Sequence, residues 1–309
     1  MVFLMLNEFE IIDMHVHTYP DSKIGLQAMQ GTGVSGMTGT IEELLQNMKE
    51  GNISRAIQVN MTPVREMADA ALKKLPKNLT LEKMKEEEIK IIEKMKGRNI
   101  RRNDWTCDMA DKHEQLIAYV SLDPLCGSAM ITELLDKVKN RNVKGIKIHP
   151  GNGRFFPYDK RMWHVYEKAV ELKIPIITHA GGFFTPDNIQ YAQPKHFTEV
   201  LETFDNLILV LAHLGIGFYD ETRTLAKKFD NNLYFDCSRA ITSGKMWGTL
   251  KDDQAIELIR NIGIERVMWS SDYPWCNPAK DAQKIASMNF RNEEKIMLFA
   301  ENAKKILKI

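Results

Sequence analysis

Short apolar runs alternate with amphipathic segments along most of the chain. From residue 116 onward, these runs are separated by longer stretches in which apolar positions recur at helical spacing. With two runs nearer the amino terminus, the pattern predicts eight strands. They are expected at residues 11–17, 56–59, 116–120, 143–150, 174–179, 207–213, 233–237 and 266–272. Strands that alternate with helices are typical of an α/β protein with a parallel sheet.

Amphipathic segments between the runs are expected to form the crossover helices. The first begins after Thr40, which can cap it, because Ile41, Leu44 and Met48 follow at helical spacing. Others are predicted at residues 130–139, 159–172, 196–204, 221–229 and 252–261. A last amphipathic segment, residues 293–308, is predicted to form a C-terminal closing helix.

Eight strands separated by helices favour a (β/α)8 TIM barrel over a doubly wound sheet. A barrel of this kind typically needs about 250 residues. The chain has 309, so we expect one domain, residues 1–309, that carries an insertion. The glycines after the strands at 174–179 and 207–213 do not form Gly-x-Gly-x-x-Gly, which weakens the dinucleotide-binding alternative.

Two segments depart from the alternation. Residues 18–39 contain several glycines and no apolar period, as expected of a long loop and candidate mobile lid over an active site. Residues 64–114 exceed one crossover helix and are interpreted as a helical insertion after the second strand, with helices at 66–75 and 81–96. Arg98, Arg101 and Arg102 could reach an anionic group, but they are interpreted first as a solvated basic turn.

Composition argues against several classes of partner. Lys and Arg number 42 against 41 Asp and Glu, and no long block of one sign is present, so nothing indicates nucleic acid or an anionic membrane. The four cysteines form no Cys-x-x-Cys pair and are expected to be reduced thiols. The apolar start is too short for a signal peptide or a membrane span. We expect a soluble, cytoplasmic protein whose partner is a small molecule.

Histidines, a lysine and an aspartate lie at the carboxyl ends of five predicted strands. They are His15 and His17, Lys147 and His149, His179, His213, and Asp272. Side chains two apart on a strand share a face, and in a barrel all strands end at one mouth, where residues are typically catalytic. Neutral imidazoles with one carboxylate suit zinc with an open position for water. The sequence therefore predicts a catalytic metal site.

These strand ends resemble the amidohydrolase superfamily, within it the group that includes aminocarboxymuconate-semialdehyde decarboxylase, resorcylate decarboxylases and pyrone-dicarboxylate lactonases. The matching pieces are Asp13-Met14-His15-Val16-His17, Gly145-Ile146-Lys147-Ile148-His149-Pro150, Thr178-His179-Ala180-Gly181, Ala212-His213-Leu214-Gly215 and Ser271-Asp272-Tyr273-Pro274. The resemblance implies that His15, His17, His179 and Asp272 hold one divalent ion, which we expect to be zinc, with manganese as the alternative. It also implies that His213 does not bind the ion and lies near the substrate. It also suggests a homodimer.

Two reactions remain open at such a site. In hydrolysis, our first hypothesis, the ion lowers the pKa of bound water for attack on a lactone, ester or amide. Asp272 then accepts the proton, while His213 steadies the oxyanion or acts as an acid. The alternative is non-oxidative decarboxylation of an aromatic or unsaturated acid by the same residues. Resorcylate-type decarboxylases often have a carboxylate where this chain has His15, which favours hydrolysis or the semialdehyde type. A non-catalytic metal-binding barrel is a third hypothesis.

Further residues in the loops after the strands are candidates for substrate binding. Lys147 is expected to be an unmodified cation near the mouth, with a carboxylated bridge between two ions as the alternative. His149 lines the pocket or caps the strand. Arg154 and Arg239 are candidate anchors for a substrate carboxylate. Aromatic residues of the same loops are candidate walls of an apolar pocket: Phe155, Phe156, Phe183, Phe184, Tyr273 and Trp275.

Overall fold

Eight parallel strands form the centre of the computed structural model, which describes residues 6–30, 35–182, 186–242 and 248–309. Each strand pairs with the next one in the chain, in the order β1 to β8. Their bounds are β1 (Ile11–Val16), β2 (Ile53–Gln58), β3 (Leu116–Ser121), β4 (Gly145–Ile148), β5 (Ile176–Thr178), β6 (Leu209–Leu211), β7 (Leu233–Asp236) and β8 (Val267–Met268). The predicted (β/α)8 barrel is confirmed.

Backbone hydrogen bonds between the chain after β8 and β1 close the barrel. The amide of Met14 donates to the carbonyl of Trp269 at 3.3 Å, and the amide of Asp272 donates to the carbonyl of His15 at 2.9 Å. The amide of His17 donates to Tyr273 at 2.6 Å. The strand predicted at 266–272 is therefore shorter than expected, but this seam still brings residue 272 beside residues 15 and 17.

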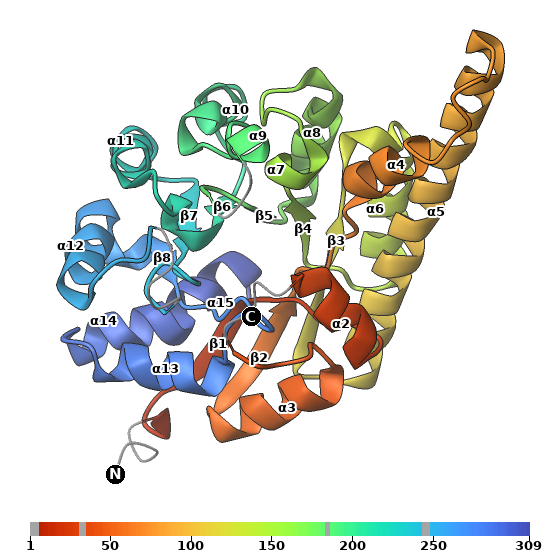
Figure 1. Cartoon of the computed structure of the whole chain (residues 1–309). Coiled ribbons are helices and arrows are strands. Elements are labelled where there is room, and N and C mark those ends of the chain that lie inside the picture. Colours follow the sequence, from red (N-terminus) through yellow and green to blue (C-terminus); the bar gives the residue numbers. More distant parts are fainter. Residues whose placement is uncertain (1–5, 31–34, 183–185, 243–247) are drawn as a thin grey trace.

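Helices surround the barrel (Figure 1). Those between successive strands or after them are α3 (Ile41–Glu50), α6 (Ala129–Asn140), α8 (Trp163–Leu172), α10 (Thr198–Thr203), α11 (Tyr219–Lys228), α12 (Asp252–Ile262) and α13 (Pro278–Ser287). Thr40 caps α3 as predicted, since its side chain accepts from the Glu43 amide. Helix α13 was not predicted, because most of its buried apolar side chains are alanines, which give a weak periodic signal.

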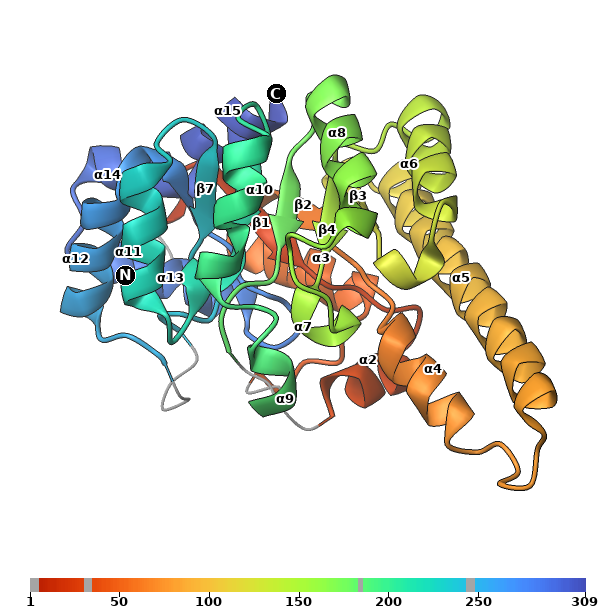
Figure 2. The same ribbon diagram turned by 90° about the horizontal axis from the view of Figure 1, so that it is seen from above.

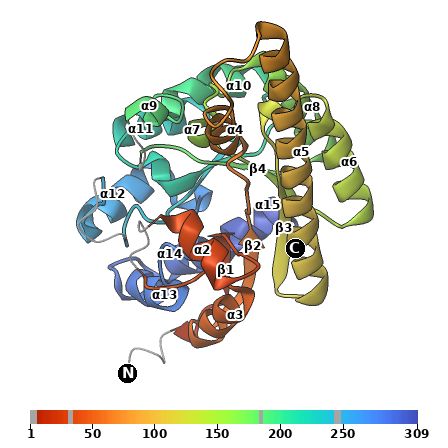
Figure 3. The same cartoon turned by 45° about the vertical axis from the view of Figure 1, so that its right-hand side comes forward.

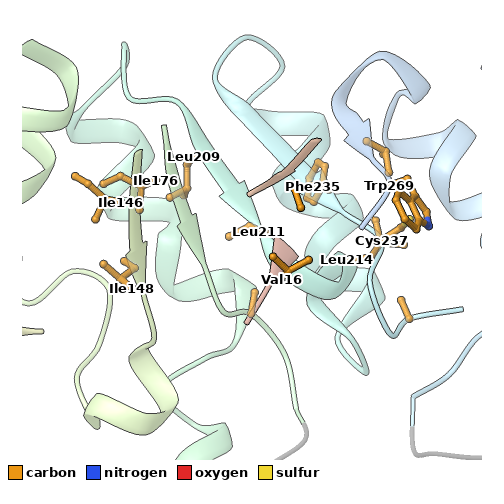
Figure 4. Packing of buried hydrophobic residues seen from close by; sticks show 14 of the residues in the cluster. Val16, Ile146, Ile148, Ile176, Leu209, Leu211, Leu214, Phe235, Cys237 and Trp269 are labelled. Atoms are coloured by element: carbon orange, nitrogen blue, oxygen red, sulfur yellow. The ribbon is translucent and has the colours of Figure 1, made fainter. Parts of the chain in front are cut away.

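Side chains of the strands divide between an outer and an inner core. Val16, Ile148 and Leu211 belong to the outer core between strands and helices, part of which is drawn in Figure 4. The inner core fills the barrel. Its members include Ile12, Met14, Tyr119, Ile177, Val210, Tyr234 and Met268, and below them Ala300, Ala303, Ile306 and Leu307 of the C-terminal segment. The chain end therefore closes the barrel opposite the mouth.

The closing segment differs in detail from the single helix predicted at 293–308. It consists of α14 (Asn292–Ile296), a π-helical stretch (Met297–Glu301) and α15 (Asn302–Leu307). In Figure 2, α15 lies on the side of the barrel away from α2 (Ser22–Met29), α7 (Pro150–Gly153) and α9 (Pro186–Ile189). These three short helices follow the carboxyl ends of β1, β4 and β5, so they mark the mouth.

The segment at residues 18–39 was predicted to be a long loop. The structure instead contains helix α2 within it, and Asp21 caps this helix.

The insertion after β2 lies within the predicted residues 64–114, but more of it is helical than expected. It contains α4 (Val64–Leu72) and α5 (Leu81–Lys112), so the helix predicted at 81–96 continues for another 16 residues, from 97 to 112. Figures 1 and 3 show α5 running along one flank of the barrel and extending beyond it. Its second half was missed because its buried face is mostly polar, with Asn99, Asn103 and Thr106.

Among the described residues, no helix is both long and apolar enough to cross a membrane.

Candidate metal centre

His15 and His17 converge at the end of β1. The register of β1 against β2 shifts between Asp13 and Val16, so the regular alternation of side chains is interrupted there. Met14 consequently faces the inner core while Val16 belongs to the outer one. The Nε2 atoms of His15 and His17 lie 3.1 Å apart, so both rings point to one place, as their spacing predicted.

Asp272 completes a triangle of possible metal ligands with these histidines. Its Oδ1 lies 3.5 Å from Nε2 of His15 and 3.5 Å from Nε2 of His17. Ligands at about 2.1 Å from a tetrahedral ion are roughly 3.4 Å from one another. The three atoms therefore have the mutual spacing that a zinc-sized ion requires.

His213 joins the same group. Its possible ligand atom and those of His15 and Asp272 all lie within 4.8 Å of one another. His213 has a left-handed backbone (φ 60°), as do Arg239 (φ 57°) and Asp272 (φ 59°). Such residues cost roughly 1–3 kcal/mol each and tend to cluster at functional sites. The predicted distinction between His213 as an unligated residue and the other histidines as ligands stays a prediction.

His179 and His149 form a stacked pair beside this group. Their ring centroids are 4.1 Å apart with an interplanar angle of 4°, and the His179 ring lies 4.9 Å from that of His213. Nδ1 of His149 accepts from the Asn152 amide and so caps α7. The structure thus brings the predicted ligand His179 into the same cluster of imidazoles.

Asp236, at the end of β7, is a site residue that the sequence analysis missed. Its Oδ2 lies 2.9 Å from Nδ1 of His15, and both side chains are fully buried. A carboxylate behind a ligand histidine is typical of metal sites. The sequence does place Asp236 near the carboxyl end of the strand predicted at 233–237, which could have identified it. No recognisable motif surrounds this aspartate, so it was not selected.

Two buried cations face the carboxylate and the imidazoles. Nζ of Lys147 lies 3.1 Å from Nε2 of His15, and Nη1 of Arg239 lies 3.6 Å from Oδ2 of Asp272. Burial lowers the pKa of Lys147 to about 8, although Asp236 and Asp272 oppose this shift. The structure therefore brings both residues to the site, as the sequence predicted.

Burial also governs the protonation of the candidate metal ligands. It raises the pKa of Asp272 to about 7, against the lowering effect of Arg239 and Lys147. It holds the pKa of each imidazole well below its ordinary value in His15, His17, His179 and His213. Neutral imidazole is the form that binds a metal, so the environment favours ligation.

Some predicted substrate contacts lie elsewhere. Nη1 of Arg154 lies 2.7 Å from Asp69 Oδ2 of α4, and its Nε donates to Asn188 of α9, so Arg154 joins the helices around the mouth. Tyr273 is fully buried in the outer core, and its hydroxyl donates to Glu43 at 2.7 Å. Substrate binding by Arg154 and Tyr273 stays a prediction. A position just after a strand does not fix where a side chain points, so the sequence could not predict these contacts.

The remaining aromatic candidates divide among several surroundings. The Trp275 ring packs edge-on against His17 with centroids 5.3 Å apart, so it lies at the site. Phe155 is buried in the outer core, and Phe156 stacks on Tyr158. Phe183 and Phe184 fall outside the described residues.

The insertion reaches the chain that directly follows the two candidate ligand histidines. Arg102 of α5 donates to the carbonyl of Thr18, and its guanidinium lies 4.8 Å from the centroids of both Tyr19 and Trp105. The arginines at 98–102 therefore lie on a helix rather than on a solvated turn. Arg102 packs against the residues that directly follow His17.

The fold and this cluster together define a metal-dependent TIM-barrel enzyme. A family model described as amidohydrolase matches residues 12–309, so the chain belongs to the amidohydrolase family. A search of curated proteins found no match.

Several solved structures share the fold. A 2,6-dihydroxybenzoate decarboxylase from Rhizobium is 14% identical, with a TM-score of 0.70 and coverage of 97% of this chain and 99% of the other. A dihydroxybenzoic acid decarboxylase from Polaromonas sp. JS666, solved with manganese and 2-nitroresorcinol, is 15% identical, with a TM-score of 0.71 and coverage of 97% of each chain. A 5-carboxyvanillate decarboxylase from Sphingomonas paucimobilis is 14% identical, with a TM-score of 0.67 and coverage of 97% and 99%.

Proposed function

We propose that the protein is a metal-dependent, non-oxidative decarboxylase of a small aromatic or unsaturated carboxylic acid. The observation that carries this proposal is the buried charge around the donors. Asp236 and Asp272 contribute negative charge, and Lys147 and Arg239 contribute positive charge. These four charges balance. Asp13 is also fully buried, but burial raises the pKa of its carboxyl to about 7, so at neutral pH it adds only part of a negative charge. A divalent ion would therefore leave the buried site with excess positive charge. An anionic substrate such as a carboxylate neutralises that excess.

The comparisons support decarboxylation over the hydrolysis that the sequence analysis placed first. Three of the structures that match across nearly the whole chain are aromatic-acid decarboxylases, and one of these three holds manganese. At 14–15% identity they establish the shared fold, and the choice of reaction for this chain remains our proposal.

We assign the ion to His15, His17, His179 and Asp272, with His213 beside it. Imidazoles with a carboxylate accept zinc or manganese, so the donor set fits either ion. When bound, such an ion supplies a Lewis acid that holds and polarises a substrate carboxylate or hydroxyl.

The chain's own groups would orient the substrate and move a proton. The Arg239 guanidinium and the Lys147 ammonium would hold the carboxylate, and Trp275 would form an apolar wall. When the carbon–carbon bond breaks, carbon dioxide leaves and the electron pair stays on the former carboxylated carbon. Asp272 would take up a proton from solvent, deliver it to that carbon and return to its ionised form. His213 would hydrogen-bond to the substrate on the same side.

Hydrolysis is the second candidate, because His15 is a histidine where many resorcylate-type decarboxylases carry a carboxylate. In that reaction Asp272 would accept a proton from the attacking water and pass it to the leaving group, and His213 would steady the oxyanion.

Product analysis separates the candidates. The protein is loaded with zinc or manganese and offered hydroxybenzoates and unsaturated acids labelled at the carboxyl carbon, beside lactones, esters and amides. We expect metal-dependent release of labelled carbon dioxide. Acid formed from a lactone, ester or amide without carbon dioxide would establish hydrolysis instead. A filled site without turnover on any substrate would favour the non-catalytic barrel.

A further inference from the structure

The end of β7 contacts two of the site histidines from behind. Asp236 is fully buried, and its carboxylate accepts from five donors. They are Nδ1 of His15, the amides of His213 and Ser238, and the hydroxyls of Ser238 and Ser270. Ser238 in turn contacts Nδ1 of His213 through its hydroxyl at 2.8 Å and its carbonyl at 3.2 Å.

The contact with Asp236 determines the tautomer of His15. An ionised carboxylate only accepts hydrogen bonds, so Nδ1 of His15 must carry the proton. The neutral ring then has a lone pair on Nε2, and this atom faces His17 and Asp272. Burial keeps the pKa of His15 well below its ordinary value, which is consistent with a neutral ring.

The same reasoning applies to His213 through Ser238. The hydroxyl of Ser238 donates its proton to Asp236 Oδ1, so toward His213 the oxygen can only accept. The Ser238 carbonyl is also an acceptor. Nδ1 of His213 must therefore carry its proton, and Nε2 bears the lone pair. The hydrogen bond from the His213 backbone amide to Asp236 also stabilises the left-handed backbone conformation of His213.

We infer that Asp236 and Ser238 are positioning residues that set both His15 and His213 in the Nδ1–H tautomer before any ion or substrate arrives. For His15 this exposes a lone pair to the ion. For His213 it exposes a lone pair that accepts a hydrogen bond from the substrate side, so a role of His213 in steadying an oxyanion would require a protonated ring. The consequence for catalysis rests on the proposed function, whereas the tautomers themselves do not.

Nitrogen NMR of metal-free, 15N-histidine-labelled protein reads the tautomers directly. His15→Gln and His213→Gln variants assign the two rings. We expect both wild-type rings to show protonated Nδ1 and bare Nε2. In Asp236→Asn, where the amide can donate as well as accept, the Nε2–H form of His15 should appear.

Zinc affinity, measured by competition with a chelating dye, gives a second readout. Loss of a carboxylate behind a ligand histidine typically weakens metal binding about 10- to 100-fold, and we expect that change in Asp236→Asn. The matched control is Asp123→Asn, an equally conservative change of a buried aspartate beyond the end of β3, where Oδ1 accepts from the Leu125 amide. It should bind zinc like the wild type.

Protonated Nε2 on either ring of the wild type would overturn the inference, whether or not the variant folds. So would wild-type tautomers together with wild-type zinc affinity in Asp236→Asn. A wild type that shows both expected tautomers but binds no zinc would instead contradict the proposed function and leave the inference standing.

Discussion

Asp272 connects the two halves of the site at the scale of single residues. Its Oδ1 faces the histidines of β1, and its Oδ2 faces Arg239. In our proposal the side chain therefore both binds the ion and contacts the group that would hold the substrate carboxylate. Its left-handed backbone (φ 59°) is consistent with a position maintained for function.

Replacing Asp272 by Asn keeps the shape of the side chain but removes its charge and its ability to deliver a proton. We expect turnover to fall by about 10²–10⁴-fold, the usual contribution of a general acid or base, while some metal stays bound to the histidines. Steady-state kinetics with metal analysis of the same sample measures both. Asp123→Asn is the control with unchanged turnover, and unchanged turnover in Asp272→Asn would remove this residue from the mechanism.

A second residue-scale prediction concerns pH and lies away from the mouth. Hydrogen bonds from Arg260 lower the pKa of Glu294 from 4.5 to about 2, with further help from Arg291. As the pH falls below 4.5, the unfolded chain takes up a proton at this position while the folded chain does not. The stabilisation is therefore complete above that pH and is lost as the pH falls toward 2.

Glu294→Gln should lower the free energy of unfolding by about 1–2 kcal/mol at pH 7, since the partner Arg260 is half exposed. The difference from the wild type should shrink between pH 4.5 and pH 2. Urea titrations across this range test it, with the exposed Glu301→Gln as control. A constant difference at all pH values would mean that the charge of Glu294 contributes nothing.

At the scale of elements, α5 is attached to β3 by an asparagine that mimics a strand partner. Oδ1 of Asn103 accepts from the Ser121 amide at 2.9 Å, and its Nδ2 donates to Glu133 at 3.1 Å. Asn103 is fully buried. Ser121 ends β3 and pairs in register with Lys147, so this attachment also supports a strand of the site.

Asn103→Leu keeps the volume but leaves the Ser121 amide without its partner. We expect a loss of about 1–3 kcal/mol in the free energy of unfolding. Asn140→Ala removes an exposed asparagine whose side chain donates to Asp136, and it should change this free energy by less than about 0.5 kcal/mol. Equal effects of the two substitutions in chemical denaturation would show that the buried amide does not anchor the helix.

The strands could be predicted from the sequence more completely than the helices. Strand positions follow from continuous apolar runs, and the polar residues that end them converge in any parallel barrel, which is why His15, His17, Lys147 and Asp272 were found together. The second half of α5 escaped prediction because its buried face is polar. Asp236 escaped because its role depends on a contact with His15, 221 residues away in the chain.

At the scale of the whole molecule, the two ends of the barrel have different roles. The mouth carries the polar cluster, and the opposite end is closed by apolar side chains of α15. In barrels of this type, residues at the far end contribute to stability rather than chemistry.

Ile306→Ala tests this division, because Ile306 is buried in the inner core. We expect the cavity to cost about 2–4 kcal/mol in the free energy of unfolding, with unchanged zinc affinity of the folded protein. The exposed Ile309→Ala is the control for stability. A variant with weakened zinc binding under conditions where it is fully folded would show that the two ends are coupled.

The metal centre is the central claim, and the most direct measurement is metal content per chain. Elemental analysis of wild-type protein purified without chelator is compared with the His17→Ala variant. The account predicts close to one divalent ion per wild-type chain and a large loss in the variant. Close to two ions would support a carboxylated Lys147 bridge. No bound ion in the wild type, even after zinc or manganese is supplied, would contradict the assignment of the site.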